Sequence, residues 1–136
     1  MEIYIIFSID RAFDLHTRKK FLIHMDNMRA MGHLKERVVQ TIGMWKGELE
    51  DSFLMGIDDF QNHVPFSFYQ DQEALMMIHK YPEADKVEFV TPDWLSLSGR
   101  WAGQLVGVPF EEAIKEDGWT YRPDLKTYYI LKELED

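Results

Sequence analysis

The fold is decided by residues 43–55, which read GMWKGELEDSFLM. This pattern predicts one strand that runs into a tight acidic turn and returns as an apolar strand. Glu48, Glu50 and Asp51 crowd the expected turn beside Trp45. Carboxylates and an aromatic face both attract positive charge. The stretch therefore predicts either a solvated hairpin with acidic tips or a surface for a small cationic ligand.

Apolar runs on both sides of this stretch predict further strands. The arms of the hairpin are expected over residues 37–45 and 52–57, and an opening strand over residues 3–8. Later in the chain, apolar runs predict strands at residues 74–78 and 86–90, a strand-and-turn region through 97–101 and 104–108, and a terminal hairpin over 119–131 with its turn at 122–126.

Helical spacing is found mainly in one segment. Residues 14–31 predict a helix that Asp14 can cap and Gly32 can end. Its apolar residues recur at the spacing of a helix face: Phe21, Leu22, Met25 and Met28. Asp58 and Asp59 offer a cap for a short helical stretch that Pro65 interrupts, and residues 110–116 predict one or two helical turns.

The order of these elements predicts the fold class. A strand is followed by a helix, a strand pair, a short helix and further strands, without repeats or linkers. We expect a single α+β domain over residues 1–136, with helices packed on one face of a mainly antiparallel sheet, as in a ferredoxin-like sandwich.

Composition restricts the function classes. The formal net charge of −9 argues against binding nucleic acid, since phosphate contacts need clustered Lys and Arg. The chain has no cysteine, which favours a reducing cytoplasm. The first apolar run ends at Ile9, too early for a signal peptide or a membrane span. An acidic protein that occupies the basic groove of a host regulator remains open.

Sequence motifs give little support to common chemistries. The histidines show no metal-ligand spacing, and neither a GxGxxG nor a Walker loop is present, so we expect no metal and no cofactor. Ser8 and Ser52 lack the context of a nucleophile elbow. A second polar cluster, residues 71–73, precedes the strand at 74–78. Its Gln72 can donate to and accept from a nucleobase or an amino-acid head group.

Taken in order, these segments resemble the phage-encoded S-adenosylmethionine-degrading enzymes, described as hydrolases and more recently as lyases. The likeness covers most of the chain and is carried by IYIIFS at residues 3–8, MRA at 28–30, TIGMW at 41–45, ED at 50–51, YQDQE at 69–73, LSGR at 97–100, VP at 108–109, Ala113 and GWTY at 118–121. Two departures stand out: the family has tyrosine where this chain has Trp45, and the loop between Trp45 and Glu50 is shorter than usual.

The resemblance implies a function and a site. The family cleaves S-adenosylmethionine to 5′-methylthioadenosine and homoserine lactone, as homotrimers that hold substrate between subunits, and depletes the methyl donor in the host cytoplasm as an anti-restriction device. It implies a catalytic Glu50 that holds the substrate ammonium, with Trp45, Asp51, Gln72 and Ser8 binding the rest of the molecule. Three alternatives stay open: hydrolysis to homoserine, a non-catalytic acidic protein that binds a host regulator, and a protein that sequesters a nucleotide signal.

Overall fold

The computed structural model describes residues 2–8, 15–31, 37–70, 72–97 and 101–133. Strands dominate it. The strands are β1 (Glu2–Ser8), β2 (Val38–Trp45), β3 (Glu48–Gly56), β4 (Leu75–Lys80), β5 (Asp85–Val90), β6 (Gly103–Val108), β7 (Gly118–Arg122) and β8 (Thr127–Lys132). The helices are α1 (Leu15–Ala30), α2 (Ile57–His63), the 3-10 turn η1 (Phe66–Phe68) and α3 (Phe110–Ala113).

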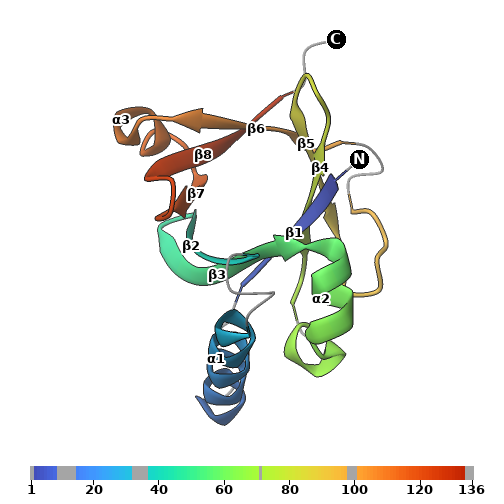
Figure 1. The fold of residues 1–136 in the computed structure, drawn as a ribbon. Helices are drawn as coiled ribbons and strands as arrows, with labels where there is room; N and C mark the ends of the chain where they lie inside the picture. The colour runs from blue at the N-terminus through green and yellow to red at the C-terminus, as the bar shows by residue number, and fades with distance from the viewer. Residues whose placement is uncertain (1, 9–14, 32–36, 71, 98–100, 134–136) are drawn as a thin grey trace.

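The strands form a closed antiparallel barrel in the order β1-β3-β2-β7-β8-β6-β5-β4 (Figure 1). Closure depends on β1, which pairs with β3 along one edge and with β4 along the other. The expected α+β sandwich is therefore wrong. The other expected strands lie close to observed ones, whereas residues 98–100 of the expected strand-and-turn region at 97–101 lie outside the described residues. The observed strands curve around an interior instead of forming an open sheet that helices cover on one face.

The hairpin of β2 and β3 turns at Lys46 and Gly47, not at the acidic residues. Both turn residues have positive φ, 48° and 84°. Such a pair matches the type I′ turn that suits the twist of a tight hairpin, and glycine takes this conformation without strain. Glu48 and Glu50 consequently belong to β3, where Glu50 pairs with Gly43. The expectation of an acidic turn is wrong, and the carboxylates are distributed over the two faces of a strand.

Alternation along the strands divides apolar side chains between the interior and the outside of the barrel. The inner cluster has Leu54, Ile78 and Val87 at its centre. Partly buried neighbours complete it: Tyr4, Ile6, Val39, Met76, Phe89 and Leu105. The neighbouring positions Ile5 and Phe7 point the other way, into a cluster that the helices cover.

Helices α1 and α2 cover the outside of β1 and β3. Phe21, Met25 and Met28 of α1 pack against Phe7 and other strand residues in a shared cluster. The aromatic contacts are close: the Phe7 ring centroid lies 4.9 Å from that of Phe60 on α2. Helix α3 packs elsewhere, against β8, with Ala113 fully buried.

The expected limits of the first helix cannot be compared with the structure, and the expected cap of the second helix is wrong. Asp14 and Gly32, the expected limits of the first helix, lie outside the described residues. Helix α2 begins at Ile57 after Gly56 and has no side-chain cap hydrogen bond, so Asp58 and Asp59 are in its first turn and do not cap it. Asp59 instead accepts a hydrogen bond from Arg37 at 2.7 Å.

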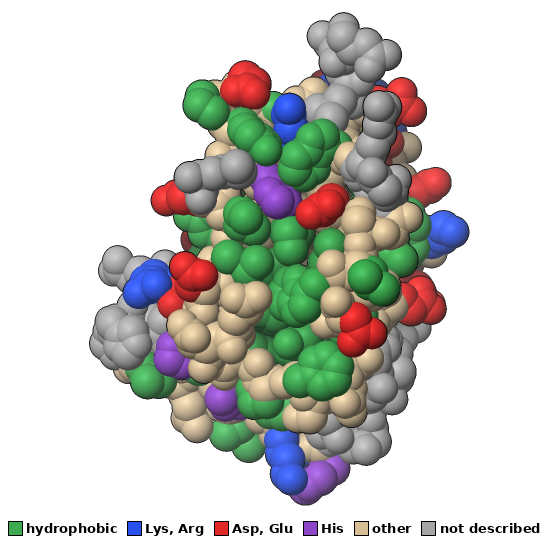
Figure 2. All heavy atoms as spheres, turned by 90° about the vertical axis from the view of Figure 1, so that its right-hand side faces the viewer, with side chains coloured by type: hydrophobic (Ala, Val, Ile, Leu, Met, Phe, Trp, Pro, Cys, Tyr) green, Lys and Arg blue, Asp and Glu red, His purple; other side chains and the backbone are tan. Residues whose placement is uncertain are grey.

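One outer face of the barrel is notably apolar. Figure 2 shows the side of the molecule on which β4, β5 and α2 lie, and hydrophobic side chains form a continuous area there with charged groups around it. Apolar areas of this kind are typical of contact surfaces.

Candidate functional site

The interior of the barrel contains a cavity at each end. One has a volume of about 740 Å³ and the other about 450 Å³, and side chains from all the strands line both. Ile6, Leu105, Thr120 and Tyr129 line both cavities and so mark the waist between them. Both volumes lie in the range of small-molecule sites, roughly 300–1,000 Å³. An eight-stranded barrel is also wide enough to hold one small ligand.

The smaller cavity, which we call the Glu50 cavity, is acidic and aromatic. Glu50 lies on the inner face of β3, and Glu116 and Asp117 are the other acidic residues among those that line the cavity. Its other lining residues are Ile6, Ser8, Gly43, Met44, Trp45, Ser52, Ala74, Met76, Phe89, Leu105, Gly118, Trp119, Thr120, Tyr129 and Leu131. None of these described lining residues is Lys, Arg or His. This lining favours a ligand with positive charge and an aromatic or apolar body.

The structure brings together several of the residues expected in the site. Glu50, Trp45 and Ser8 all line the Glu50 cavity, although they come from three different strands. Asp51 does not line it: as the next residue along β3 it points to the opposite face, and it is exposed. Gln72 does not line the cavity either, but it is held next to it.

Gln72 is buried beside Ser8. Its Oε1 accepts a hydrogen bond from the Ser8 amide at 3.3 Å. Its Nε2 is buried without a hydrogen-bond partner among the described residues, although the side chain is only 4% exposed. A buried amide donor without a partner is costly. Gln72 therefore holds the end of β1 that forms part of the cavity wall.

Trp45 lies at the mouth of the Glu50 cavity and is 58% exposed. It stands opposite Gly118 in the register of β2 and β7. A Cβ on Gly118 would approach Cε3 of Trp45 to 2.7 Å, so glycine gives the indole its space. The Lys46 ammonium lies 5.3 Å from the ring centroid. The indole face is thus within reach of a cation in the structure.

The sequence analysis did not place residues 116–119 in the site, although GWTY at 118–121 contributes to the family resemblance. Glu116, Asp117 and Trp119 line the cavity from the segment between α3 and β7. The Lys46 amide donates to the Asp117 carbonyl at 2.8 Å, which ties this segment to the hairpin turn. The two segments are far apart in sequence, and the only available signal was a pair of acidic residues before Gly118.

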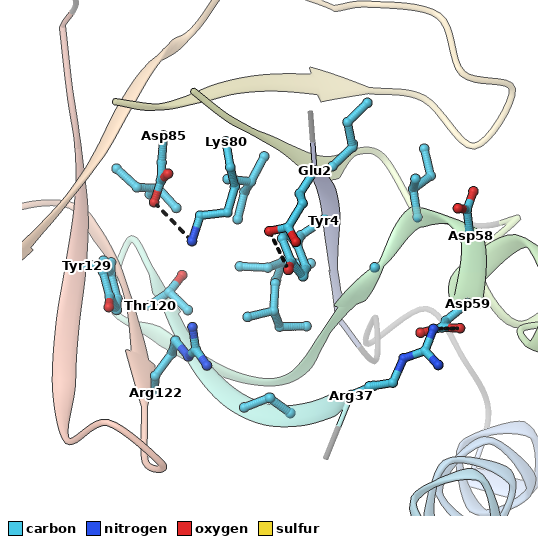
Figure 3. Close-up of a pocket in the computed structure, with 18 residues that line it drawn as sticks. Glu2, Tyr4, Arg37, Asp58, Asp59, Lys80, Asp85, Thr120, Arg122 and Tyr129 are labelled. Carbon is cyan, nitrogen blue, oxygen red and sulfur yellow. Dashed lines mark hydrogen bonds and ion pairs between the residues drawn. The ribbon is translucent and has the colours of Figure 1, made fainter. Parts of the chain in front are cut away.

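The larger cavity opens at the other end of the barrel, and charged residues of both signs line it (Figure 3). Its acidic residues are Glu2, Asp58, Asp59 and Asp85, and its basic residues are Arg37, Lys80 and Arg122. The Lys80 ammonium lies 3.8 Å from Asp85, and Arg37 pairs with Asp59 at 2.7 Å. Below these charges the wall is apolar, formed by Ile6, Val39, Leu54, Ile78 and Leu105.

Tyr4 lies among the charges of this mouth. Its hydroxyl donates to Glu2 Oε2 at 3.0 Å. Burial raises the pKa of Tyr4 above its usual value, and the hydrogen bond and negative charge of Glu2 raise it further, while the positive charge of Arg122 opposes the rise. Arg122 on β7 therefore acts electrostatically on a side chain of β1, across the interior of the barrel.

Metal sites and membrane-spanning helices are both absent from the described residues. In that part of the chain, no group of three or more His, Cys, Asp and Glu side chains could hold a metal ion. Among the described helices, none has the length and apolar character needed to span a lipid bilayer.

Neither the models of known protein families nor the curated proteins include one that matches this chain.

Proposed function

We propose that this protein cleaves S-adenosylmethionine to 5′-methylthioadenosine and homoserine lactone, with the substrate bound in the Glu50 cavity. The observation that carries the proposal is the lining of that cavity, which combines three acidic residues with aromatic residues and includes no described basic residue. S-adenosylmethionine carries a sulfonium, an ammonium and one carboxylate, so it is a net cation with an aromatic base. Its charge and shape suit such a wall.

The proposed reaction needs neither a protein nucleophile nor a proton transfer. An oxygen of the substrate's own carboxylate attacks the γ-carbon and forms the new C–O bond. The C–S bond breaks, and its electron pair stays on sulfur, which leaves as a neutral thioether. The enzyme has only to fold the methionine end into attack geometry. In well-oriented intramolecular reactions this effect is worth up to about 7–11 kcal/mol.

Charge balance defines the role of Glu50. The reaction neutralises a carboxylate against a sulfonium, so a poorly solvating pocket favours the transition state over the ground state. A protein carboxylate placed directly on the sulfonium would stabilise a charge that must disappear. We therefore assign Glu50 to the substrate ammonium, which keeps its charge throughout the reaction, and Trp45 to the face of the adenine or the sulfonium. Ser8 lies on the same wall as Glu50.

Product identification tests this proposal. The purified protein is incubated with S-adenosylmethionine, and the products are identified by mass spectrometry at early time points. We expect methylthioadenosine and homoserine lactone in equal amounts. Direct formation of homoserine would instead make water the nucleophile. Intact substrate under all conditions would overturn the proposal and leave the non-catalytic alternatives, a protein that binds a host regulator or sequesters a nucleotide signal.

The proposal extends to a homotrimer with its sites between subunits. Because the barrel is closed, every strand already has neighbours on both edges, so assembly is not needed to cover exposed strand edges. Exposed apolar side chains give a different reason for assembly. Trp45 and Leu49 are each 58% exposed, and Trp45 lies at the mouth of the Glu50 cavity. A second copy that covers them would exclude water from the substrate.

Sedimentation equilibrium is expected to give three times the chain mass of 16.2 kDa. Replacing Leu49 with glutamate places a charge on the exposed apolar surface and should shift the protein toward the monomer. Leu125→Glu is the matched control, since Leu125 is also exposed, at 52%, but lies in the turn between β7 and β8. A native protein that sediments at the mass of one chain would contradict the trimer.

The proposed cellular role follows from the proposed reaction. Cleavage in the cytoplasm of an infected bacterium would deplete the methyl donor and weaken methylation-dependent restriction.

A further inference from the structure

We propose that the larger cavity, at the mouth opposite Glu50, is a second ligand site and binds a small zwitterion with an apolar body, of the α-amino acid class. This inference is independent of S-adenosylmethionine cleavage. It rests on the charges of both signs at the mouth, on their placement on opposite walls and on the apolar wall below them.

The two walls of this mouth differ in charge. On one side, Glu2 of β1 is paired in register with Lys80 of β4, and Asp85 of β5 lies 3.8 Å from the Lys80 ammonium. These three groups sum to one negative charge. Arg122 lies across the barrel on β7, separated from β1 by β3 and β2 in the strand order. Figure 3 shows the side chains of Arg122 and Lys80 directed into the cavity from different sides.

Arg122 retains hydrogen-bonding capacity for a ligand. Its Nε and Nη2 donate to the Asp124 carboxylate at 3.2 and 2.7 Å. Nη1 takes no part in these two bonds, and an arginine offers five N–H donors. Thr120, two residues earlier on the same strand, also lines the cavity. Although Asp124 balances the charge of Arg122, the guanidinium and Thr120 form a hydrogen-bonding wall that suits a carboxylate.

The acidic wall can accept an ammonium group. Oε2 of Glu2 accepts the Tyr4 hydroxyl, and its second oxygen takes no part in that bond. The Tyr4 ring adds an aromatic face that already lies 5.7 Å from the Lys80 ammonium. The ammonium of a zwitterion placed here would face Glu2 and Asp85, while its carboxylate faced Arg122.

Ligands of a single charge fit this mouth less well. A simple anion would be attracted by Arg122 but repelled by Glu2, Asp58 and Asp85. A simple cation would meet Arg122 and Lys80. A zwitterion satisfies both walls, and the apolar wall around Leu54, Ile78 and Leu105 can take up a hydrophobic side chain.

Calorimetric titration with L-phenylalanine and two derivatives tests this inference. Phenylalanine amide lacks the carboxylate, and N-acetylphenylalanine lacks the ammonium. We expect phenylalanine to bind, and each derivative to bind at least roughly tenfold more weakly, because each loses a charge-assisted hydrogen bond. Absence of phenylalanine binding, or equal binding of either derivative, would overturn the proposal.

Variants of the β7 wall make the test specific. Arg122→Gln should weaken phenylalanine binding by about tenfold or more. Asp124→Asn is the matched control, because Asp124 contacts the same guanidinium but does not line the cavity; its loss leaves the Arg122 charge uncompensated, so phenylalanine should bind at least as tightly as to the native protein. Arg122→Lys keeps the charge and should bind with intermediate affinity. If Asp124→Asn weakened binding as much as Arg122→Gln, the effect would be structural and the site would be refuted.

One further variant separates this inference from the proposed function. Glu50→Gln should leave phenylalanine binding intact, since Glu50 does not line the larger cavity. If S-adenosylmethionine is not cleaved but phenylalanine binds as described, only the proposed function fails. If cleavage occurs but phenylalanine does not bind, only the second site fails.

Discussion

Replacing Glu50 with glutamine is expected to lower the rate of methylthioadenosine release from S-adenosylmethionine by at least about 100-fold, the scale of loss caused by misplacing a reacting group by about 1 Å. Glutamine keeps the size of the side chain but removes the negative charge that would hold the substrate ammonium. Because Glu50 is only partly buried and lines a cavity, the folded state should tolerate the change. Chromatographic quantification of methylthioadenosine at early time points measures the effect.

The adjacent carboxylate supplies the control. Asp51→Asn makes the same change of charge one residue along β3, on the opposite face of the strand and outside the cavity. It should retain nearly full activity and should unfold at the same denaturant concentration as Glu50→Gln. Full activity of Glu50→Gln, or equal loss in both variants, would show that the Glu50 side chain does not position the substrate.

The positions of the strands could be predicted from the sequence, whereas their closure could not. The expected strand at residues 3–8 is observed as Glu2–Ser8, and the expected strand at 86–90 as Asp85–Val90. Apolar runs and alternation are local signals, so they locate elements well. Whether a sheet is open or closed depends on pairings between distant segments. The contact of β1 with β4 joins residues more than 70 positions apart, such as Ile5 and Met77.

The backbone conformation of the hairpin turn explains why the prediction of an acidic turn was wrong. Three acidic residues near the middle of residues 43–55 suggested an acidic turn, but the structure turns at Lys46-Gly47, where both residues have the positive φ that a two-residue hairpin turn requires. A shift of the turn changes which side chains share a face. The observed register places Glu50 toward the interior and Asp51 outside.

The candidate site was predictable only where its residues lay within a recognisable segment. Trp45 and Glu50 are on the two strands of one hairpin, and Ser8 ends the first strand. Residues 116–119 are about 70 positions away from the hairpin in sequence and join the site only because β7 pairs with β2. A prediction of an open sandwich could not place β7 beside β2, and so it could not include these residues.

The aromatic cluster between the barrel and its helices should contribute most to stability. Phe7 is 1% exposed, and its ring contacts Phe21, Phe53 and Phe60 at centroid distances of 5.7, 6.0 and 4.9 Å. Phe7→Ala should therefore lower the free energy of unfolding by about 3–5 kcal/mol, because it removes the buried ring and leaves a cavity among the others. That is a large share of a typical total of about 5–15 kcal/mol.

Urea unfolding followed by circular dichroism measures this effect, and Phe110→Ala provides the comparison. Phe110 is 49% exposed at the start of α3, so the same truncation there should cost less than about 1 kcal/mol. Phe7→Leu, which fills part of the space, should fall between the two if Phe7→Ala proves too unstable to purify. Equal stability of Phe7→Ala and Phe110→Ala would mean that α1 and α2 do not pack on the outside of β1. The wall that carries Ser8 would then lack its support, since Phe7 and Ser8 are adjacent on that strand and point to opposite sides of it.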